Sequence, residues 1–180
     1  MTVKFRTLTA DDIECRVNTV SAKGCSLLLY KDARCDMKIL DESVGAMNWQ
    51  RNHVLINNRL FCNVSIYDED RSEWVTKQDV GTESYTEKEK GQASDAFKRA
   101  CFNWGIGREL YTAPFIWVNT DSVTLKETTD SNGKKKYTTY DKFRVTQIMV
   151  EDGEIKALAI KNDSLGKMAY KCDKRTDNGR

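Results

Sequence analysis

The chain has 180 residues, of which 39% are hydrophobic, and its formal net charge is +2 at pH 7. This composition predicts a globular protein with its own core, and the small net charge means that any surface for a polyanion must be local. No apolar run approaches the roughly 18 residues of a membrane span, and the N-terminus lacks the apolar stretch of a signal peptide. We therefore expect no membrane partner and a cytoplasmic protein.

The six cysteines do not form a C-x-x-C motif, and His53 is the single histidine. Metal sites built from thiolates and imidazoles need clusters of such residues. We therefore expect no metal and no cofactor, and we interpret the cysteines as free thiols of a reducing compartment.

The N-terminal segment, residues 9–24, is predicted to form a helix. Ile13, Val17 and Val20 fall on one helical face, and Gly24 ends the pattern. A short buried strand, residues 26–30, is expected to follow.

A second short helix is predicted from the spacing of Met37, Leu40 and Val44, and Gly45 is expected to end it. Its apolar residues recur at helical intervals over a short segment. It is therefore expected to lie beside the core as one of several flanking helices.

Three strands are predicted next, at residues 49–56, 60–67 and 73–80. Apolar and polar residues alternate in the second of them, and Asn57–Asn58 suits a tight turn between the first two. Short connections between consecutive strands indicate an antiparallel meander.

A long helix is predicted to follow the meander, starting near Thr86, which forms a capping-box pattern with Glu89. Its apolar stripe consists of Ala93, Phe97, Ala100, Cys101 and Trp104. On a helical wheel, the opposite side carries Lys88, Asp95, Lys98, Arg99 and Phe102. That side is either an ordinary solvated face or a phosphate-binding surface in which an aromatic residue stacks on bases.

The C-terminal third is more polar. Residues 119–141 are predicted to be a polar loop, either a solvated hairpin or a mobile segment. Residues 142–162 are predicted to form a hairpin around Asp152–Gly153. Residues 165–180 are expected to be a loose tail.

These elements predict an α+β fold, in which an antiparallel three-stranded meander packs on one long helix as a β-β-β-α core. Flanking short helices and a C-terminal β-hairpin complete the expected architecture. We expect a single domain over residues 1–180, with its core at about 25–118.

The family is suggested by three stretches, "YKDARCDMKILDESVGAMNW", "VTKQDVGTES" and "EKGQASDAFKRACFNWGIGRELY". The last is the most specific, because it combines an acidic residue, a Lys-Arg-Ala triplet and an aromatic-glycine helix end. With these motifs the chain resembles the Rad52 family of single-strand DNA annealing proteins, and most closely its short phage members of the Sak type. The resemblance covers residues 30–114.

This resemblance implies binding of single-stranded DNA and ATP-independent annealing of complementary strands in recombination and repair, by a ring or related homo-oligomer with a basic groove. It further implies that the protein is not an enzyme and that a single-strand-binding protein is a possible partner. If the protein is phage-encoded, its compartment is the cytoplasm of a bacterial host.

The residues expected to bind DNA are the Lys98–Arg99 pair, which corresponds to the paired cations of the family, and five further residues: Lys90, Arg34, Lys88, Lys77 and Phe102. Two positions depart from the larger family members. Phe102 stands where those members have an arginine, and Ala46 where they have a tyrosine.

Two other functions fit parts of the sequence. A single-stranded DNA-binding protector of the OB type would share the cations and aromatics, but it predicts five strands and no long helix carrying Lys-Arg. A metal-dependent nuclease would use the acidic residues around Asp68–Asp70 and Asp79. That acidic cluster lies between two predicted strands and is more typical of a hairpin turn.

Overall fold

The computed structural model describes residues 3–82 and 88–175, and the chain folds into two compact units. Unit 1 consists of Met1–Thr7 and Asp32–Arg108, and unit 2 of Leu8–Lys31 and Glu109–Arg180. Whether the two units act as a single DNA-annealing domain stays a prediction.

Unit 1 contains the helix α1 (Ala33–Val44), which begins and ends at residues suited to those positions. The carboxylate of Asp32 accepts a hydrogen bond of 2.9 Å from the backbone N–H of Cys35, which is an N-cap. At the other end Gly45 has a φ of 84°, in the region that favours glycine.

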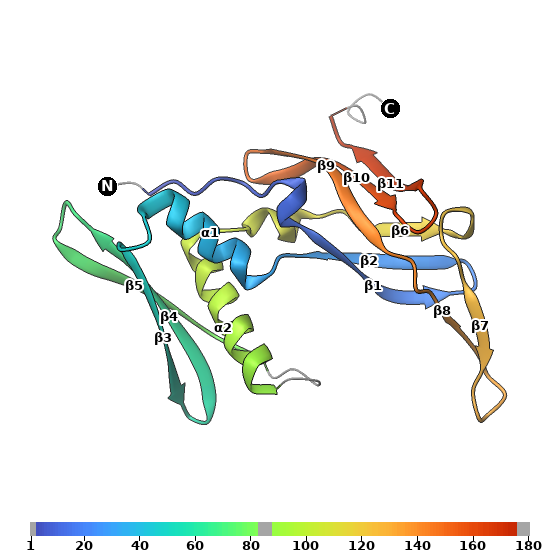
Figure 1. Cartoon of the computed structure of the whole chain (residues 1–180), viewed down its shortest axis with the longest axis horizontal. Coiled ribbons are helices and arrows are strands. Elements are labelled where there is room, and N and C mark those ends of the chain that lie inside the picture. The colour runs from blue at the N-terminus through green and yellow to red at the C-terminus, as the bar shows by residue number, and fades with distance from the viewer. Residues whose placement is uncertain (1–2, 83–87, 176–180) are drawn as a thin grey trace. The chain divides into compact units, whose positions relative to one another are not determined.

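Three strands of unit 1, β3 (Trp49–Ile56), β4 (Arg59–Asp68) and β5 (Glu73–Val80), form an antiparallel sheet with β4 in the centre (Figure 1). The β3–β4 turn uses Asn57 and Asn58, both with positive φ, as a two-residue hairpin turn requires.

The helix α2 (Lys88–Trp104) packs on β4 and β5. The middle of its apolar stripe is buried against the central strand and forms the core of the unit, whereas Ala93 and Trp104 at the two ends of the stripe are half-buried. The fully or almost fully buried side chains of these two elements include those of Cys62, Val64, Ile66, Ala96, Phe97, Ala100 and Cys101.

Unit 2 is built on a six-stranded antiparallel sheet in the order β11-β10-β9-β1-β2-β6. The strands are β1 (Glu14–Ser21), β2 (Gly24–Tyr30), β6 (Ile116–Asn119), β9 (Phe143–Glu151), β10 (Glu154–Asn162) and β11 (Lys167–Asp173). The two outer strands, β11 and β6, also contact each other, so the sheet is nearly closed. Its buried residues come mainly from β2, β6, β9 and β10.

A separate two-stranded ribbon, β7 (Lys126–Thr129) and β8 (Lys135–Thr138), extends beyond the six-stranded sheet in Figure 1. The segment predicted from the sequence to be either a hairpin or a mobile loop is therefore a hairpin. Three short 3-10 helices, η1 (Ala10–Asp12), η2 (Arg108–Thr112) and η3 (Thr120–Ser122), complete the elements of the described residues.

The predicted fold class is wrong. A three-stranded meander on one long helix describes only part of the chain, because the protein is mostly β and a six-stranded, nearly closed sheet makes up a second unit. The prediction missed this sheet because it joins strands from both ends of the sequence. Glu14 of β1, for example, pairs with Arg144 of β9.

The N-terminal helix is a second error. Thr9 precedes only the single turn η1, and its backbone N–H donates to Asp12 over 2.8 Å. The following residues form β1, whose pairing with β2 is irregular between Val17 and Thr19. This irregularity shifts the alternation of β1 and spaces its apolar residues like those of a helix.

The C-terminal tail also differs from its prediction, because Lys167–Asp173 form β11 at one end of the sheet order. An outer strand tolerates polar residues, and the segment accordingly lacks a strong apolar pattern.

Candidate nucleic-acid interface

The position of α2 on the sheet is set by a close approach at Gly81, directly after β5. A Cβ atom at this residue would lie 2.2 Å from the carbonyl oxygen of Gln92 and 2.9 Å from the backbone nitrogen of Ala96. Only glycine fits there without displacement of the helix. The contact therefore fixes how near α2 lies to the end of β5.

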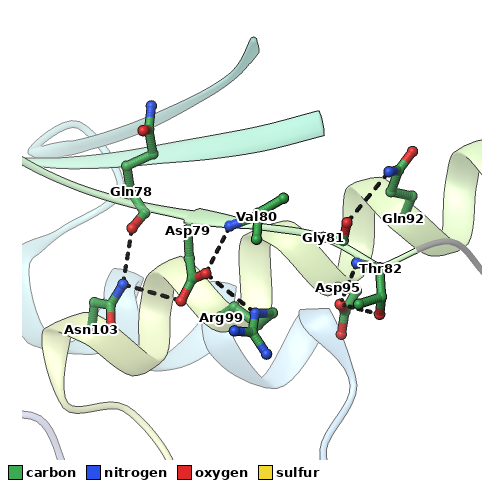
Figure 2. A network of polar contacts seen from close by, with 9 residues as sticks. All are labelled: Gln78, Asp79, Val80, Gly81, Thr82, Gln92, Asp95, Arg99 and Asn103. Carbon is green, nitrogen blue, oxygen red and sulfur yellow. Dashed lines mark hydrogen bonds and ion pairs between the residues drawn. The ribbon is translucent and has the colours of Figure 1, made fainter. Parts of the chain in front are cut away.

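A row of polar residues on α2 then joins the helix to β5 and to the residues after it (Figure 2). Asp95 accepts hydrogen bonds of 2.9 Å from both the backbone N–H and the hydroxyl of Thr82. One and two turns further along the helix, Arg99 and Asn103 contact Asp79. We call this row, with its partners Asp79 and Thr82, the polar seam.

Arg99 is the cation of the polar seam. Its Nε lies 3.3 Å from Oδ1 of Asp79, and 45% of its side chain is exposed, against 23% for Asp79. The same carboxylate accepts from the backbone N–H of Val80 and from Asn103. Arg99 is thus held in place at one side while its guanidinium stays accessible to an anion.

Lys98 lies on a different flank of the helix, because consecutive residues are about 100° apart. Its side chain is half-buried, and among the described residues no carboxylate forms an ion pair with it. The two neighbouring cations thus differ in exposure and in pairing, because Arg99 is exposed and contacts Asp79, whereas Lys98 is half-buried. Their joint role in DNA binding stays a prediction.

Phe102, which the sequence grouped with these cations, is half-buried near the end of α2. The guanidinium of Arg108 lies 5.9 Å from the centre of its ring. An aromatic ring in this position could stack on a base.

Lys77 has a structural contact. Its Nζ donates to the carbonyl oxygen of Asn103 over 2.9 Å and lies 4.6 Å from the centre of the Trp104 ring. The indole N–H of Trp104 in turn donates to the carbonyl oxygen of Val64 over 3.0 Å. A cation at the last carbonyls of a helix stabilises the negative end of the helix dipole. Lys77 therefore contributes to the packing of α2, and its role in DNA binding stays a prediction.

The remaining predicted DNA-binding residues are Arg34, Lys88 and Lys90. Arg34, in the first turn of α1, has a side chain that is 86% exposed and that contacts Asp32 over 2.7 Å. Hydrogen bonds from Cys35 and Arg34 lower the pKa of Asp32 despite the opposing effect of its burial. The side chains of Lys88 and Lys90, and the predicted capping residue Thr86, lie outside the described residues.

Residues 50–128 match the model of the Rad52/22 family double-strand break repair protein. This Rad52-like segment contains β4, β5 and α2 entirely, and with them the polar seam, Lys98 and Phe102. The comparisons with curated proteins and with solved structures gave no match. The match supports the resemblance at the level of a Rad52-like family, and the phage Sak-type subgroup stays a prediction.

Two further cations of the Rad52-like segment, Arg108 and Arg51, were not among the residues that the sequence predicted to bind DNA. Arg108 donates from Nε to the carbonyl oxygen of Phe102 and from an Nη to that of Asn103, each over 2.9 Å. Arg51 on β3 is exposed and lies 4.5 Å from the centre of the Phe97 ring. A basic residue just after the glycines that end a helix was the available signal for Arg108, whereas the position of Arg51 depends on packing across the sheet.

Among the described residues, no group of histidine, cysteine, aspartate or glutamate side chains is arranged to hold a metal ion. No described helix is long and apolar enough to cross a membrane. The described cysteines are free thiols, and burial raises the pKa of Cys15 to about 12 and that of Cys62 to about 11.

Proposed function

We propose that the protein binds single-stranded DNA along the exposed side of α2 and anneals complementary strands, without nucleotide hydrolysis, in DNA recombination and repair. The observation that carries the proposal is the family match, because it spans the helix and the sheet that present Lys98 and Arg99. The description of the matched family as a double-strand break repair protein supports the same pathway.

The chemistry of this surface suits annealing. Two single strands repel each other through their phosphates, and cations that contact the backbone lower this repulsion. Lysine and arginine contacts to phosphate do not read the sequence and leave the pairing edges of the bases available. Lys98 has no described carboxylate partner, and Arg99 has one accessible side, so both can serve in this way.

We further propose that the protein works as a homo-oligomer of many subunits, in a ring or a related form. The three-stranded sheet of unit 1 has β3 and β5 as its outer strands, and outer strands can pair with a second chain. An oligomer would multiply weak contacts along one DNA strand and so allow tight binding despite a net charge of only +2. Light scattering at micromolar concentration tests this, and a monomer with and without DNA would contradict it.

A single-strand-binding protein as a partner and a location in the bacterial cytoplasm remain predictions of the same proposal. Pull-down of a purified bacterial single-strand-binding protein tests the partner. Absence of co-purification, with and without DNA, would contradict the predicted partner. It would not affect the annealing proposal.

The test of DNA binding compares Lys98→Ala, Arg99→Ala and Phe102→Ala with the control Lys38→Ala, which removes an exposed lysine of α1. Anisotropy of a labelled oligonucleotide gives the affinity at several salt concentrations. Each cation that contacts one phosphate should lower the slope of log affinity against log salt by about 0.7 when it is removed. Loss of a stacking contact at Phe102 should weaken binding by about 1–3 kcal/mol with little change in slope.

Annealing is followed separately, by quenching between two complementary labelled strands. We expect the double variant Lys98→Ala with Arg99→Ala to lose most of the acceleration and to keep its oligomer size. Unchanged binding would show that the two residues form only a solvated face. Tight binding by the wild-type protein without faster annealing would instead support the OB-type protector function.

A further inference from the structure

The ribbon of β7 and β8 has two faces with different charge. Residues paired across an antiparallel ribbon lie on the same face, and neighbours in a strand alternate. The register pairs Lys126 with Thr138 and Thr128 with Lys136. We call the side that carries these four residues the lysine face.

Lys134 precedes β8 and continues the alternation of the lysine face, because it lies two residues before Lys136. The backbone N–H of Asp130 donates to the carbonyl oxygen of Lys134 over 2.9 Å, so the antiparallel pairing extends to this residue. The carboxylate of Asp130 is engaged within the turn, where its Oδ1 accepts from the backbone N–H groups of Asn132 and Lys134, each over 2.9 Å.

On the opposite face of the ribbon, the positive charge of Lys135 is balanced by the carboxylate of Glu127. Glu127 accepts from Nζ of Lys135 over 2.8 Å and from the hydroxyl of Tyr137 over 2.7 Å. The hydrogen bond from Lys135, and then that from Tyr137, lowers the pKa of Glu127. The one lysine on this face is therefore matched by a carboxylate.

None of the three lysines of the lysine face has such a partner. Among the described residues, no carboxylate lies within ion-pair distance of Lys126, Lys134 or Lys136, and all three side chains are exposed. Lys134 and Lys136 are alternate residues along one strand and are therefore about 6.6–6.8 Å apart. Lys126 lies on the other strand, where its partner Thr138 is the next residue on this face after Lys136.

Lysine side chains donate to phosphate oxygens, whereas the Thr128 hydroxyl already donates to the carbonyl oxygen of Lys136 over 3.3 Å. The lysine face carries no aromatic residue on which an unpaired base could stack, and in this it differs from the surface of α2 with Phe102. A double helix needs no stacking partner, because its bases are already paired, and its major groove admits a two-stranded β-ribbon. These features favour a duplex over a single strand as the ligand of this face.

We propose that the lysine face of the β7–β8 ribbon is a second binding site, which contacts the phosphate backbone of double-stranded DNA. The site is formed by unit 2 alone, and the duplex is the product of the annealing proposed for α2. The choice of DNA rather than another polyanion rests on that proposed function, whereas the position of the site rests only on the charges of the ribbon.

The decisive comparison is between two neighbouring lysines, Lys136→Gln and Lys135→Gln. The two substitutions remove the same charge at adjacent positions of the same strand, but from opposite faces. Binding of the full-length protein to a labelled blunt duplex of about 20 base pairs is measured by anisotropy between 50 and 200 mM salt. The single-stranded form of the same oligonucleotide is measured in parallel.

For Lys136→Gln we expect weaker duplex binding, with the slope of log affinity against log salt reduced by about 0.9, and for the triple variant of Lys126, Lys134 and Lys136 a reduction of about 2.7. Lys135→Gln should leave the slope unchanged. Equal effects of the two single variants, or no effect of the triple variant, would overturn the proposal.

Two further measurements distinguish this proposal from the single-strand site on α2 and from binding of anionic lipid. Lys98→Ala should reduce single-strand binding and leave the duplex slope unchanged, so that failure of either site is seen independently. Vesicles containing phosphatidylserine should not compete with the duplex. Competition that is lost in the triple variant would assign the lysine face to anionic lipid and would overturn the assignment to DNA.

Discussion

Replacing Asp79 with asparagine is expected to strengthen single-stranded DNA binding through Arg99. In the polar seam the guanidinium lies 3.3 Å from the Asp79 carboxylate, and a phosphate must compete with this ion pair. The two side chains are 45% and 23% exposed, and ion pairs of such exposure contribute about 0.2–1 kcal/mol. Removing the carboxylate should therefore raise the affinity by roughly 1.4-fold to five-fold.

The control for this prediction is Asp95→Asn, which removes a carboxylate charge one helical turn from Arg99 on α2. Asp95 binds Thr82, so the control accounts for any general gain from a lower negative charge. Anisotropy titrations of both variants, each repeated with Arg99→Ala, form a double-mutant cycle. A gain for Asp79→Asn no larger than for Asp95→Asn, or one that persists without Arg99, would refute the role of the ion pair.

Two further predictions concern the stability of unit 1. Gly81→Ala should destabilise the protein by about 1–3 kcal/mol, because the added Cβ would lie 2.2 Å from the Gln92 carbonyl oxygen; an unchanged urea unfolding curve would contradict the close approach. Asp32→Ala should cost about 0.5–2 kcal/mol at pH 7 through loss of the N-cap of α1. Because the pKa of Asp32 is lowered from 3.8 in the folded protein, its contribution is present above about pH 4 and is lost as the pH falls further. The difference between wild type and variant should therefore shrink in acid, and a difference independent of pH would count against the carboxylate cap.

The meander and the helices of unit 1 could be located from the sequence because their signals are local. β3 and β5 begin and end where the alternation and the turn residues predicted. The short helix ends at Val44, one residue before Gly45. Each of these features depends on residues only a few positions apart.

The sheet of unit 2 could not be derived in this way. Its order depends on pairing between β1 and β9, which are separated by most of the chain. In addition, the irregularity between Val17 and Thr19 gives the apolar residues of β1 a helix-like spacing. β6 has only four residues, too few for a periodic pattern.

The candidate site was predictable in part. The helical wheel located the buried stripe around Phe97 and Ala100. It could not show that Arg99 pairs with Asp79, a residue of a neighbouring strand, or that Lys77 reaches the end of α2. Such contacts depend on how the helix lies across the sheet, which the helical period does not specify.

The path of the chain through the two units has a consequence for folding during synthesis. Asp32–Arg108 of unit 1 lie between the two segments of unit 2, so the ribosome completes β3–β5 and α2 before β9 exists. Until β6 and β9 emerge, β1 and β2 can form only a hairpin, which is marginally stable alone and leaves the outer edges of both strands unpaired. We therefore expect nascent chains that stop after Arg108 to contain a folded unit 1 attached to an aggregation-prone hairpin.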